Sequence, residues 1–266
     1  MIRVLVCGFR GRMGIQVVRA IAAAEDMELV AGFDPLAGEG SVESDGVRLA
    51  PAFISLAQAI EDTHPDVLVD FTAPGAVEAT IRTALSFGLD CVIGTTGLSR
   101  ERYEELAADA PENVTLFHAP NFTIGAVLMM SFARKAAAFF EDVEVIEFHH
   151  NGKADAPSGT ALTTARAIAD VRAEAGRTSE APGAETELAD RKGARGTFVD
   201  GIPVHSVRSN GFVAHQEVIL GSMGETLTIR HDSIDRASYM PGVLLAIRAV
   251  GKRSGLIIGL KELMGL

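Results

Sequence analysis

Side chains that can exchange protons are concentrated in one short stretch of the chain, residues 147–161. It reads EFHHNGKADAPSGTA and places His149, His150 and Lys153 within a single loop's length. An imidazole can gain and lose a proton near neutral pH, and a lysine carries a positive charge that can hold a carboxylate. The stretch therefore predicts a site where a charged substrate takes up a proton.

The segments on either side of this loop are predicted to position it. Residues 143–148 read as a strand with apolar residues, and we expect both of its acids, Glu144 and Glu147, on the wetter side. After the loop, Ser158 is a favoured helix N-cap, and the pattern predicts a helix over 160–172. The amides of the first helical turn are then free to bind an anion such as a substrate carboxylate.

The N-terminal part of the chain has the pattern of a nucleotide site. Residues 4–14 read VLVCGFRGRMG, which predicts a strand, a glycine turn and the start of a helix. Glycine lets the backbone approach a pyrophosphate, which then lies at the helix N-terminus. The spacing GxxGxxG differs from the usual GxGxxG, so these residues alone also fit a tight turn without a ligand. The candidate cofactor residues here are Gly8, Phe9, Arg10, Gly11, Arg12, Met13 and Gly14.

Asp34 stands at the end of the second predicted strand, where an acid commonly binds the ribose hydroxyls of a dinucleotide. A carboxylate there repels the 2′-phosphate of NADPH, whereas Arg10 and Arg12 in the glycine loop can neutralise that phosphate. We therefore expect the protein to use NADH or NADPH. The alternative is that Asp34 only forms a turn before Pro35.

Strands and helices alternate in the first half of the chain, which predicts an α/β fold with a doubly wound parallel sheet. The predicted strands are 2–7, 28–33, 66–71, 90–93 and 114–118, and the predicted helices are 13–24, 56–63, 76–87 and 100–110. After Asn121 the pattern changes to that of a second, α+β domain. We expect there a helix over 124–140, a polar surface excursion over 173–200, and successive antiparallel strands at 202–208, 212–220 and 225–231. The segment 239–266 reads as helix with a glycine-rich break.

The order of residues in 147–161 resembles the signature of the 4-hydroxy-tetrahydrodipicolinate reductase family, with His-His, Lys and Asp-Ala-Pro-Ser-Gly-Thr-Ala all in place. Gly-Arg-Met-Gly at 11–14 also matches this family's form of the dinucleotide loop, and the resemblance covers essentially the whole chain. It implies a Rossmann-type domain at 1–121 that is completed by 239–266. It further implies an inserted domain at 122–238 that binds substrate and assembles a homotetramer.

The resemblance also implies roles for individual residues. His149 is the expected proton donor, and Lys153 is expected to hold a carboxylate or the developing ring charge and to share the donor role. The residues expected to bind substrate are His150, Ser158, Gly159 and Thr160. Further contacts to the nicotinamide end of the cofactor are expected from Gly94, Thr95, Thr96, Ala119, Pro120, Asn121 and Phe122.

The implied reaction belongs to the diaminopimelate route to lysine. A cyclic dicarboxylate loses its hydroxyl as water, and hydride from the nicotinamide adds to ring carbon 4 of the resulting imine. Two alternatives stay open, namely another two-domain dehydrogenase acting on an imine and a dinucleotide-binding sensor without turnover. The proton donors weigh against the sensor, because a sensor needs none.

Composition narrows the class of protein and its partners. The 266 residues are 47% hydrophobic and 22% charged, as in ordinary globular proteins, and the formal net charge of −11 argues against nucleic acid and anionic membranes as partners. No apolar run approaches a membrane span or a signal peptide. The two cysteines, Cys7 and Cys91, have no metal-type spacing, so we expect reduced thiols, a cytoplasmic protein and no metal.

Overall fold

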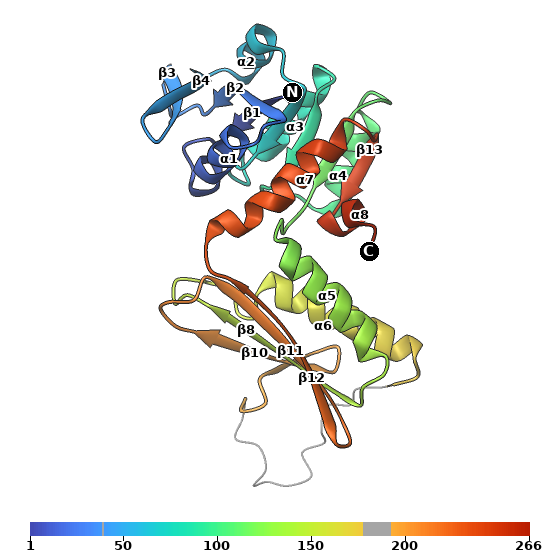
Figure 1. Ribbon diagram of the computed structural model, residues 1–266. Coiled ribbons are helices and arrows are strands. Elements are labelled where there is room, and N and C mark those ends of the chain that lie inside the picture. The colour runs from blue at the N-terminus through green and yellow to red at the C-terminus, as the bar shows by residue number, and fades with distance from the viewer. Residues whose placement is uncertain (39, 178–192) are drawn as a thin grey trace. The chain divides into compact units, whose positions relative to one another are not determined.

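The computed structural model describes residues 1–38, 40–177 and 193–266 (Figure 1). Within these ranges the chain divides into two compact units. Unit 1 comprises Met1–Ile124 and Arg236–Leu266, and unit 2 comprises Gly125–Asp235. The central part of the surface excursion predicted at 173–200 lies outside the described residues.

An eight-stranded sheet forms the centre of unit 1, in the order β13-β7-β6-β5-β1-β2-β4-β3. Seven strands run parallel: β1 Ile2–Cys7, β2 Met27–Phe33, β4 Val47–Phe53, β5 Val67–Asp70, β6 Asp90–Ile93, β7 Thr115–His118 and β13 Gly255–Ile258. The central strands are buried along almost their whole length, as expected for parallel strands covered on both faces. This confirms the predicted doubly wound parallel sheet.

Helices cover both faces of this sheet (Figure 1). Their bounds are α1 Arg12–Ala22, α2 Leu56–Thr63, α3 Val77–Ser86, α4 Arg100–Ala108, α7 Met240–Val250 and α8 Leu260–Met264, with a 3-10 turn at Arg236–Tyr239. The helices α2, α3 and α4 share one core with Leu68, Cys91 and Leu116 of the strands. The helices α1 and α7 contact each other on the opposite face.

Three strands of unit 1, namely β3, β4 and β13, were not predicted. The strand β3, Gly40–Ser44, pairs antiparallel with β4 through a two-residue turn at Asp45 and Gly46, both with positive φ. The expectation of only helix in 239–266 is also wrong, because β13 lies there and pairs parallel with β7. The short run Leu256–Ile258 between two glycines gave no periodic signal, and its partner strand supplies the hydrogen bonds that make it a strand.

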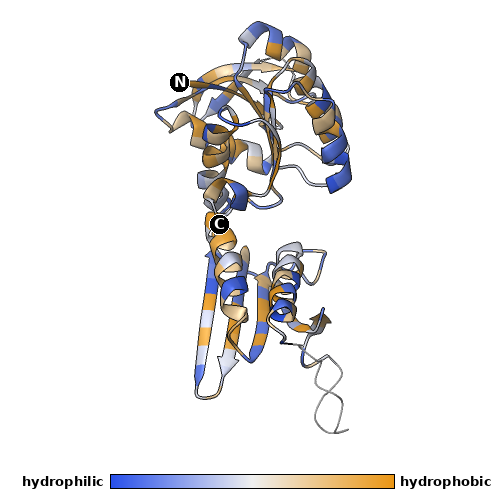
Figure 2. Ribbon diagram, turned by 90° about the vertical axis from the view of Figure 1, so that its right-hand side faces the viewer, coloured by the Kyte–Doolittle hydropathy of each residue, from blue (hydrophilic) through white to orange (hydrophobic). Residues whose placement is uncertain are grey.

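Unit 2 is built on a five-stranded sheet in the order β12-β11-β8-β10-β9. Its strands are β8 Asp142–His149, β9 Thr197–Val199, β10 Ile202–Arg208, β11 Ala214–Ser222 and β12 Glu225–Ser233. Two helices, α5 Ile124–Ala137 and α6 Gly159–Glu174, cover one face (Figure 1). Along the strands, hydrophobic and hydrophilic residues alternate, as Figure 2 shows. The alternation follows from the two-residue repeat of side chains in a strand.

The order of strands in this sheet corrects the expectation of three successive antiparallel strands. Only β11 and β12 form such a pair, whereas β10 pairs parallel with β8. The helix α6 connects β8 to the strands that follow, and a crossover of this kind returns the chain parallel to the strand it left. The strand β11 then pairs with the other side of β8, so β8 lies at the centre of the sheet.

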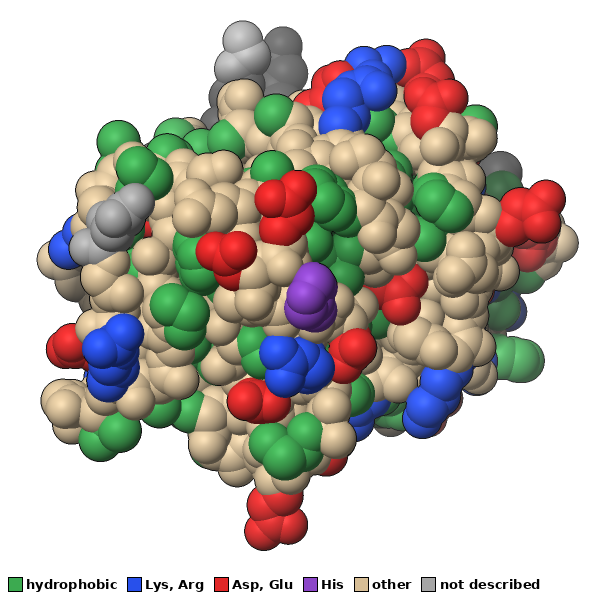
Figure 3. Space-filling view, turned by 90° about the horizontal axis from the view of Figure 1, so that it is seen from above, with side chains coloured by type: hydrophobic (Ala, Val, Ile, Leu, Met, Phe, Trp, Pro, Cys, Tyr) green, Lys and Arg blue, Asp and Glu red, His purple; other side chains and the backbone are tan. Residues whose placement is uncertain are grey.

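On the face shown in Figure 3, acidic and basic side chains are interspersed, and the basic ones do not gather into a patch. Across the described ranges, no helix is both long and apolar enough to cross a membrane. The same residues contain no group of three His, Cys, Asp or Glu side chains that could hold a metal ion.

Candidate functional site

His149 is the last residue of β8, and its position on that strand determines where its side chain points. Val143 and Val145 pack into the core between the sheet and its helices, and Glu147 and His149 continue the same alternation. The His149 side chain is 14% exposed, and its Nδ1 lies 2.5 Å from Oε2 of Glu147. The imidazole is therefore held from one side while its edge reaches the surface.

Glu147 is completely buried, so the expectation that both acids of the strand face the wetter side is wrong for this residue. Glu144 and Glu147 are three residues apart, which places them on opposite faces of a strand. The buried carboxylate is balanced by Arg208 on β10, whose Nη1 and Nη2 donate to Oε2 and Oε1 at 2.9 and 2.7 Å. The N–H of Ser158 donates to Oε1 at 3.2 Å.

Burial raises the pKa of Glu147, but the hydrogen bonds from His149 and Arg208 outweigh this effect and lower the pKa from 4.5 to about 2. The group is thus a carboxylate throughout the neutral range. Three segments, namely β8, the start of α6 and the more distant β10, meet at this one charge.

The loop that follows β8 is fixed to the same arginine. Nη2 of Arg208 donates to the main-chain oxygen of Asp155 at 2.8 Å, and the N–H of Lys153 donates to the oxygen of His150 at 3.1 Å. Nζ of Lys153 lies 2.7 Å from Oδ1 of Asp155, and this hydrogen bond lowers the pKa of the Asp155 carboxyl. The loop thus places one ammonium group and the exposed His150 next to the end of β8.

The helix α6 begins at Gly159, and Ser158 is its N-cap as predicted, since its Oγ accepts from the N–H of Ala161 at 3.2 Å. The N–H groups of Gly159 and Thr160 have no acceptor among the described residues. An ideal Cβ at Gly159 would meet nothing within 4 Å. This helix start therefore leaves two amides and the Thr160 side chain for an anionic ligand.

In unit 1, the predicted cofactor residues gather at one edge of the sheet. Cys7 lies beside Phe33 and Asp70, Asp70 lies beside Ile93, and Ile93 lies beside His118. The residue after each of these strand ends therefore reaches the same edge. This places Gly8, Asp34, Gly94 and Ala119 together at the carboxyl ends of the strands, where ligands of such sheets bind.

The glycine loop has the shape that a pyrophosphate requires. Gly8 adopts a positive φ of 75°, and an ideal Cβ at Gly14 would lie 2.0 Å from the oxygen of Gly8. Any side chain at Gly14 would thus break the turn. Gly11 is the N-cap of α1 and supplies no side chain to cap it, so the first amides of the helix stay open. The residues present therefore fit a dinucleotide phosphate at this helix start.

Four predicted cofactor residues have buried side chains, namely Phe9, Thr95, Ala119 and Phe122. Phe9 packs beside Gly32, Phe122 packs against Phe71 and Phe117, and the hydroxyl of Thr95 donates to the buried Asp70. A contact from Phe9, Thr95 or Phe122 to a cofactor would come from the main chain.

The loop after β2 joins two of the predicted charged residues. Oδ1 of Asp34 accepts from the N–H of Leu36 at 3.0 Å, and Nη1 of Arg10 donates to the oxygen of Ala37 at 3.3 Å. Asp34 therefore does form a turn, which was the alternative interpretation. The hydrogen bond to Ala37 also holds the guanidinium of Arg10, from the glycine loop, against the loop that carries Asp34.

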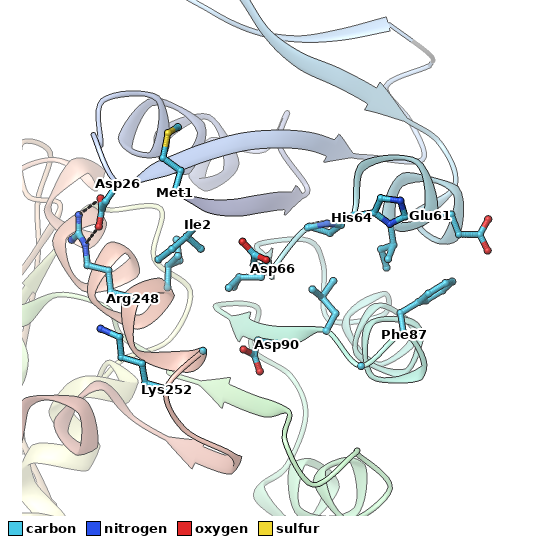
Figure 4. A pocket seen from close by; sticks show the side chains of 17 residues that line it. Met1, Ile2, Asp26, Glu61, His64, Asp66, Phe87, Asp90, Arg248 and Lys252 are labelled. Carbon is cyan, nitrogen blue, oxygen red and sulfur yellow. Dashed lines mark hydrogen bonds and ion pairs between the residues drawn. The ribbon is translucent and has the colours of Figure 1, made fainter.

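A cavity of about 910 Å³ lies at the other edge of this sheet (Figure 4). It is lined by the amino ends of three strands, at Ile2, Val67 and Asp90, and by the ion pair of Asp26 with Arg248. None of the predicted cofactor residues lines this cavity. The cavity is thus distinct from the edge where the glycine loop lies.

Comparison with protein families matches nearly the whole chain to two models. Residues 2–122 match "Dihydrodipicolinate reductase, N-terminus", and residues 125–264 match "Dihydrodipicolinate reductase, C-terminus". The chain belongs to the dihydrodipicolinate reductase family. A 4-hydroxy-tetrahydrodipicolinate reductase of Cutibacterium acnes is 48% identical over 269 residues, covering 100% of both chains. One of Mycobacterium sp. (strain KMS) is 47% identical over 267 residues, covering 99% of each.

Solved structures agree with this assignment. The dipicolinate-bound dihydrodipicolinate reductase of Paenisporosarcina sp. TG-14 is 42% identical, has a TM-score of 0.85 and covers 98% of this chain and 99% of its own. An amine dehydrogenase of Mycobacterium smegmatis, 16% identical with a TM-score of 0.64, covers 97% of this chain and 95% of its own, and shares the fold alone. The family is that of oxidoreductases using a nicotinamide cofactor, and its members reduce 4-hydroxy-tetrahydrodipicolinate in the diaminopimelate route to lysine. The family assignment therefore favours this activity over the two alternatives, which were another two-domain dehydrogenase acting on an imine and a dinucleotide-binding sensor.

Two residues of the site were not predicted, Glu147 as a buried partner and Arg208. Glu144 and Glu147 are three positions apart, so in a strand only one of them can face solvent, and this spacing could have predicted that Glu147 is buried. Arg208 is 61 residues from Glu147 in the chain, and no local pattern connects them.

Proposed function

We propose that the protein accepts its hydride from NADH or NADPH at the carboxyl edge of the unit 1 sheet. The open amides after Gly11 support a pyrophosphate contact there. Arg10 contacts the loop that carries Asp34, and the two side chains offer a partner for either form of the adenosine ribose: the guanidinium for a 2′-phosphate and the carboxylate for free hydroxyls.

This cofactor assignment is tested with the variant Arg10→Ala. It is expected to raise KM for NADPH about tenfold or more while leaving KM for NADH nearly unchanged, because only NADPH carries the charge that Arg10 would bind. In the unaltered protein the two KM values should be of similar size. A KM for NADH far above that for NADPH would contradict the proposal.

For the reaction itself, we infer that His149 donates the proton that completes the reduction, with Lys153 holding a substrate carboxylate or the developing ring charge. The observation that carries this inference is the convergence of three features on the ion pair of Glu147 with Arg208: His149 and the start of α6 contact the carboxylate, and the Lys153 loop is held by the guanidinium. His150, Ser158, Gly159 and Thr160 would bind the dicarboxylate. When bound, the nicotinamide supplies the hydride, and these residues of the chain supply orientation, charge and the proton.

The roles of the two parts of the chain in binding cofactor and substrate are also a proposal. We assign cofactor binding to residues 1–121 with 239–266, and substrate binding and assembly to 122–238. The exposed apolar side chains of Phe139 and Met223 in unit 2 support an assembly surface, for which we propose a homotetramer. Two free, buried cysteines, Cys7 and Cys91, agree with a reducing compartment such as the cytoplasm.

A further inference from the structure

The ion pair of the buried Glu147 with the partly buried Arg208 has a role that packing alone does not explain. Removing charged groups from water is unfavourable, and apolar residues of similar size often stabilise a fold at least as well as a largely buried ion pair. Here the carboxylate also contacts His149 at 2.5 Å, and the guanidinium also holds the loop that carries Lys153.

We propose that Glu147 and Arg208 are positioning residues for the reduction: Glu147 fixes His149 with its hydrogen on Nδ1, so that Nε2 is the atom that gives up the proton. This proposal rests on the role of His149 proposed above. The hydrogen bond between Nδ1 and Oε2 supports it directly, because an ionised carboxylate can only accept, and Nδ1 must then be the donor. Nε2 has no partner among the described residues and is left for the substrate.

Arg208 contributes by keeping Glu147 ionised and in one orientation. Its two hydrogen bonds engage both carboxylate oxygens in parallel, so the plane of the carboxylate is set. A single fixed orientation of Glu147 in turn fixes the ring of His149. The same arginine anchors the main chain at Asp155, so the imidazole and the Lys153 loop share one support.

The charged surroundings of His149 come from several elements. The strand β8 supplies Glu147, β10 supplies Arg208, and the loop supplies His150, Lys153 and Asp155. On β11, Gln216 is paired in register with Glu147 and is uncharged. Within this set, only Glu147 is in hydrogen-bond contact with the imidazole. Loss of this single contact should therefore change how activity depends on pH.

The test compares Glu147→Gln, Arg208→Met and the double variant E147Q/R208M. Each single variant leaves one buried charge without its partner and should lower Tm, whereas the double variant removes both charges and should recover stability. If the pair positions His149, kcat of the double variant stays about 10²-fold below that of the unaltered protein, at the lower end of the range for positioned general acids, with KM changed less. The pH dependence of kcat/KM should also differ from that of the unaltered protein.

The matched control is Glu144→Gln on the same strand. Glu144 also pairs with a histidine and an arginine, His205 at 2.6 Å and Arg195, but it lies on the opposite face of β8. This variant should leave the pH profile in place. A double variant with recovered stability and unaltered kcat and pH profile would overturn the proposal.

Nitrogen-15 spectra of histidine-labelled protein give a readout that does not depend on turnover. The His149 signals, assigned with His149→Gln, should show hydrogen on Nδ1 in the unaltered protein and a mixture of tautomers in E147Q, since an amide can donate or accept. The same tautomer in both proteins would contradict the role of Glu147. If the tautomer changes but His149→Gln keeps full activity, the proposed donor role of His149 fails instead.

Discussion

At the scale of single residues, His149 and Thr160 occupy different places around the end of β8, and replacing them should separate chemistry from binding. His149→Gln removes the proposed proton donor and should lower kcat about 10²–10⁴-fold with little change in KM. Thr160→Val keeps the shape of the helix start but removes a hydroxyl, and should raise KM for the dicarboxylate about tenfold. Steady-state kinetics of the two variants checks this, and an effect of His149→Gln on KM alone would contradict it.

Glu147 should also make stability depend on pH. Its pKa is lowered from 4.5 to about 2 in the folded protein, so the unfolded chain binds the proton first as the pH falls. The ionised carboxylate therefore makes its full contribution to the free energy of unfolding above about pH 5. This contribution is lost between about pH 5 and pH 2, and it amounts to about 3 kcal/mol for a fully buried group. Urea unfolding of the unaltered protein and E147Q at pH 7 and pH 3 measures it.

The difference in unfolding free energy between these two proteins should shrink as the pH falls. Glu225→Gln, at an exposed position on β12, is the control for loss of a carboxylate as such. An unchanged difference at pH 7 and pH 3 would show that Glu147 is not held in its ionised form.

At the scale of elements, the glycine loop between β1 and α1 should tolerate no side chain at Gly14. Gly14→Ala would place a Cβ 2.0 Å from the oxygen of Gly8, and the turn must open to relieve this contact. We expect cofactor affinity to fall at least tenfold and Tm to drop, because the open amides of α1 would be displaced. Gly40→Ala on β3 has free space around its Cβ and serves as the control. Cofactor fluorescence titration and thermal unfolding would detect both effects, and unchanged binding by Gly14→Ala would contradict the assignment.

Much of the element pattern was predictable, and the exceptions have identifiable causes. The strand β1 and the helix α2 lie at the residues predicted, because each is a continuous segment with a strong local pattern. The hairpin of β3 and β4 was missed although Asp45-Gly46 is a known hairpin dipeptide. The parallel pairing of β10 with β8 depends on a helical crossover, and the ion pair of Arg208 with Glu147 depends on that pairing. Such long-range partners leave no trace in local periodicity.

At the scale of the whole molecule, the proposed cofactor residues all belong to unit 1, and the proposed substrate residues all belong to unit 2. Each unit has its own hydrophobic core. A substitution at His149 or Lys153 should therefore leave cofactor binding intact, with a dissociation constant within about twofold of the unaltered protein. Calorimetric titration with NADH and NADPH measures this, and a large loss of cofactor affinity in either variant would contradict the separation of roles.

The number of chains in the assembly can be tested independently of cofactor binding. The proposed homotetramer predicts a mass of four chains of 28.0 kDa in light scattering after size-exclusion chromatography. Replacement of the exposed Phe139 or Met223 by Asp should shift the protein towards smaller species if these side chains lie in the interface. A monomer in the unaltered protein would contradict the proposed assembly.

The measurement that tests the account most directly is nicotinamide absorbance while the purified protein meets its substrate, made in situ from pyruvate and aspartate semialdehyde by the upstream synthase. We predict cofactor oxidation that requires the synthase and is abolished in the double variant His149→Gln with Lys153→Met, although that variant still binds cofactor. Oxidation at an undiminished rate in the double variant would contradict the assigned chemistry, as would a complete lack of oxidation with both NADH and NADPH in the unaltered protein.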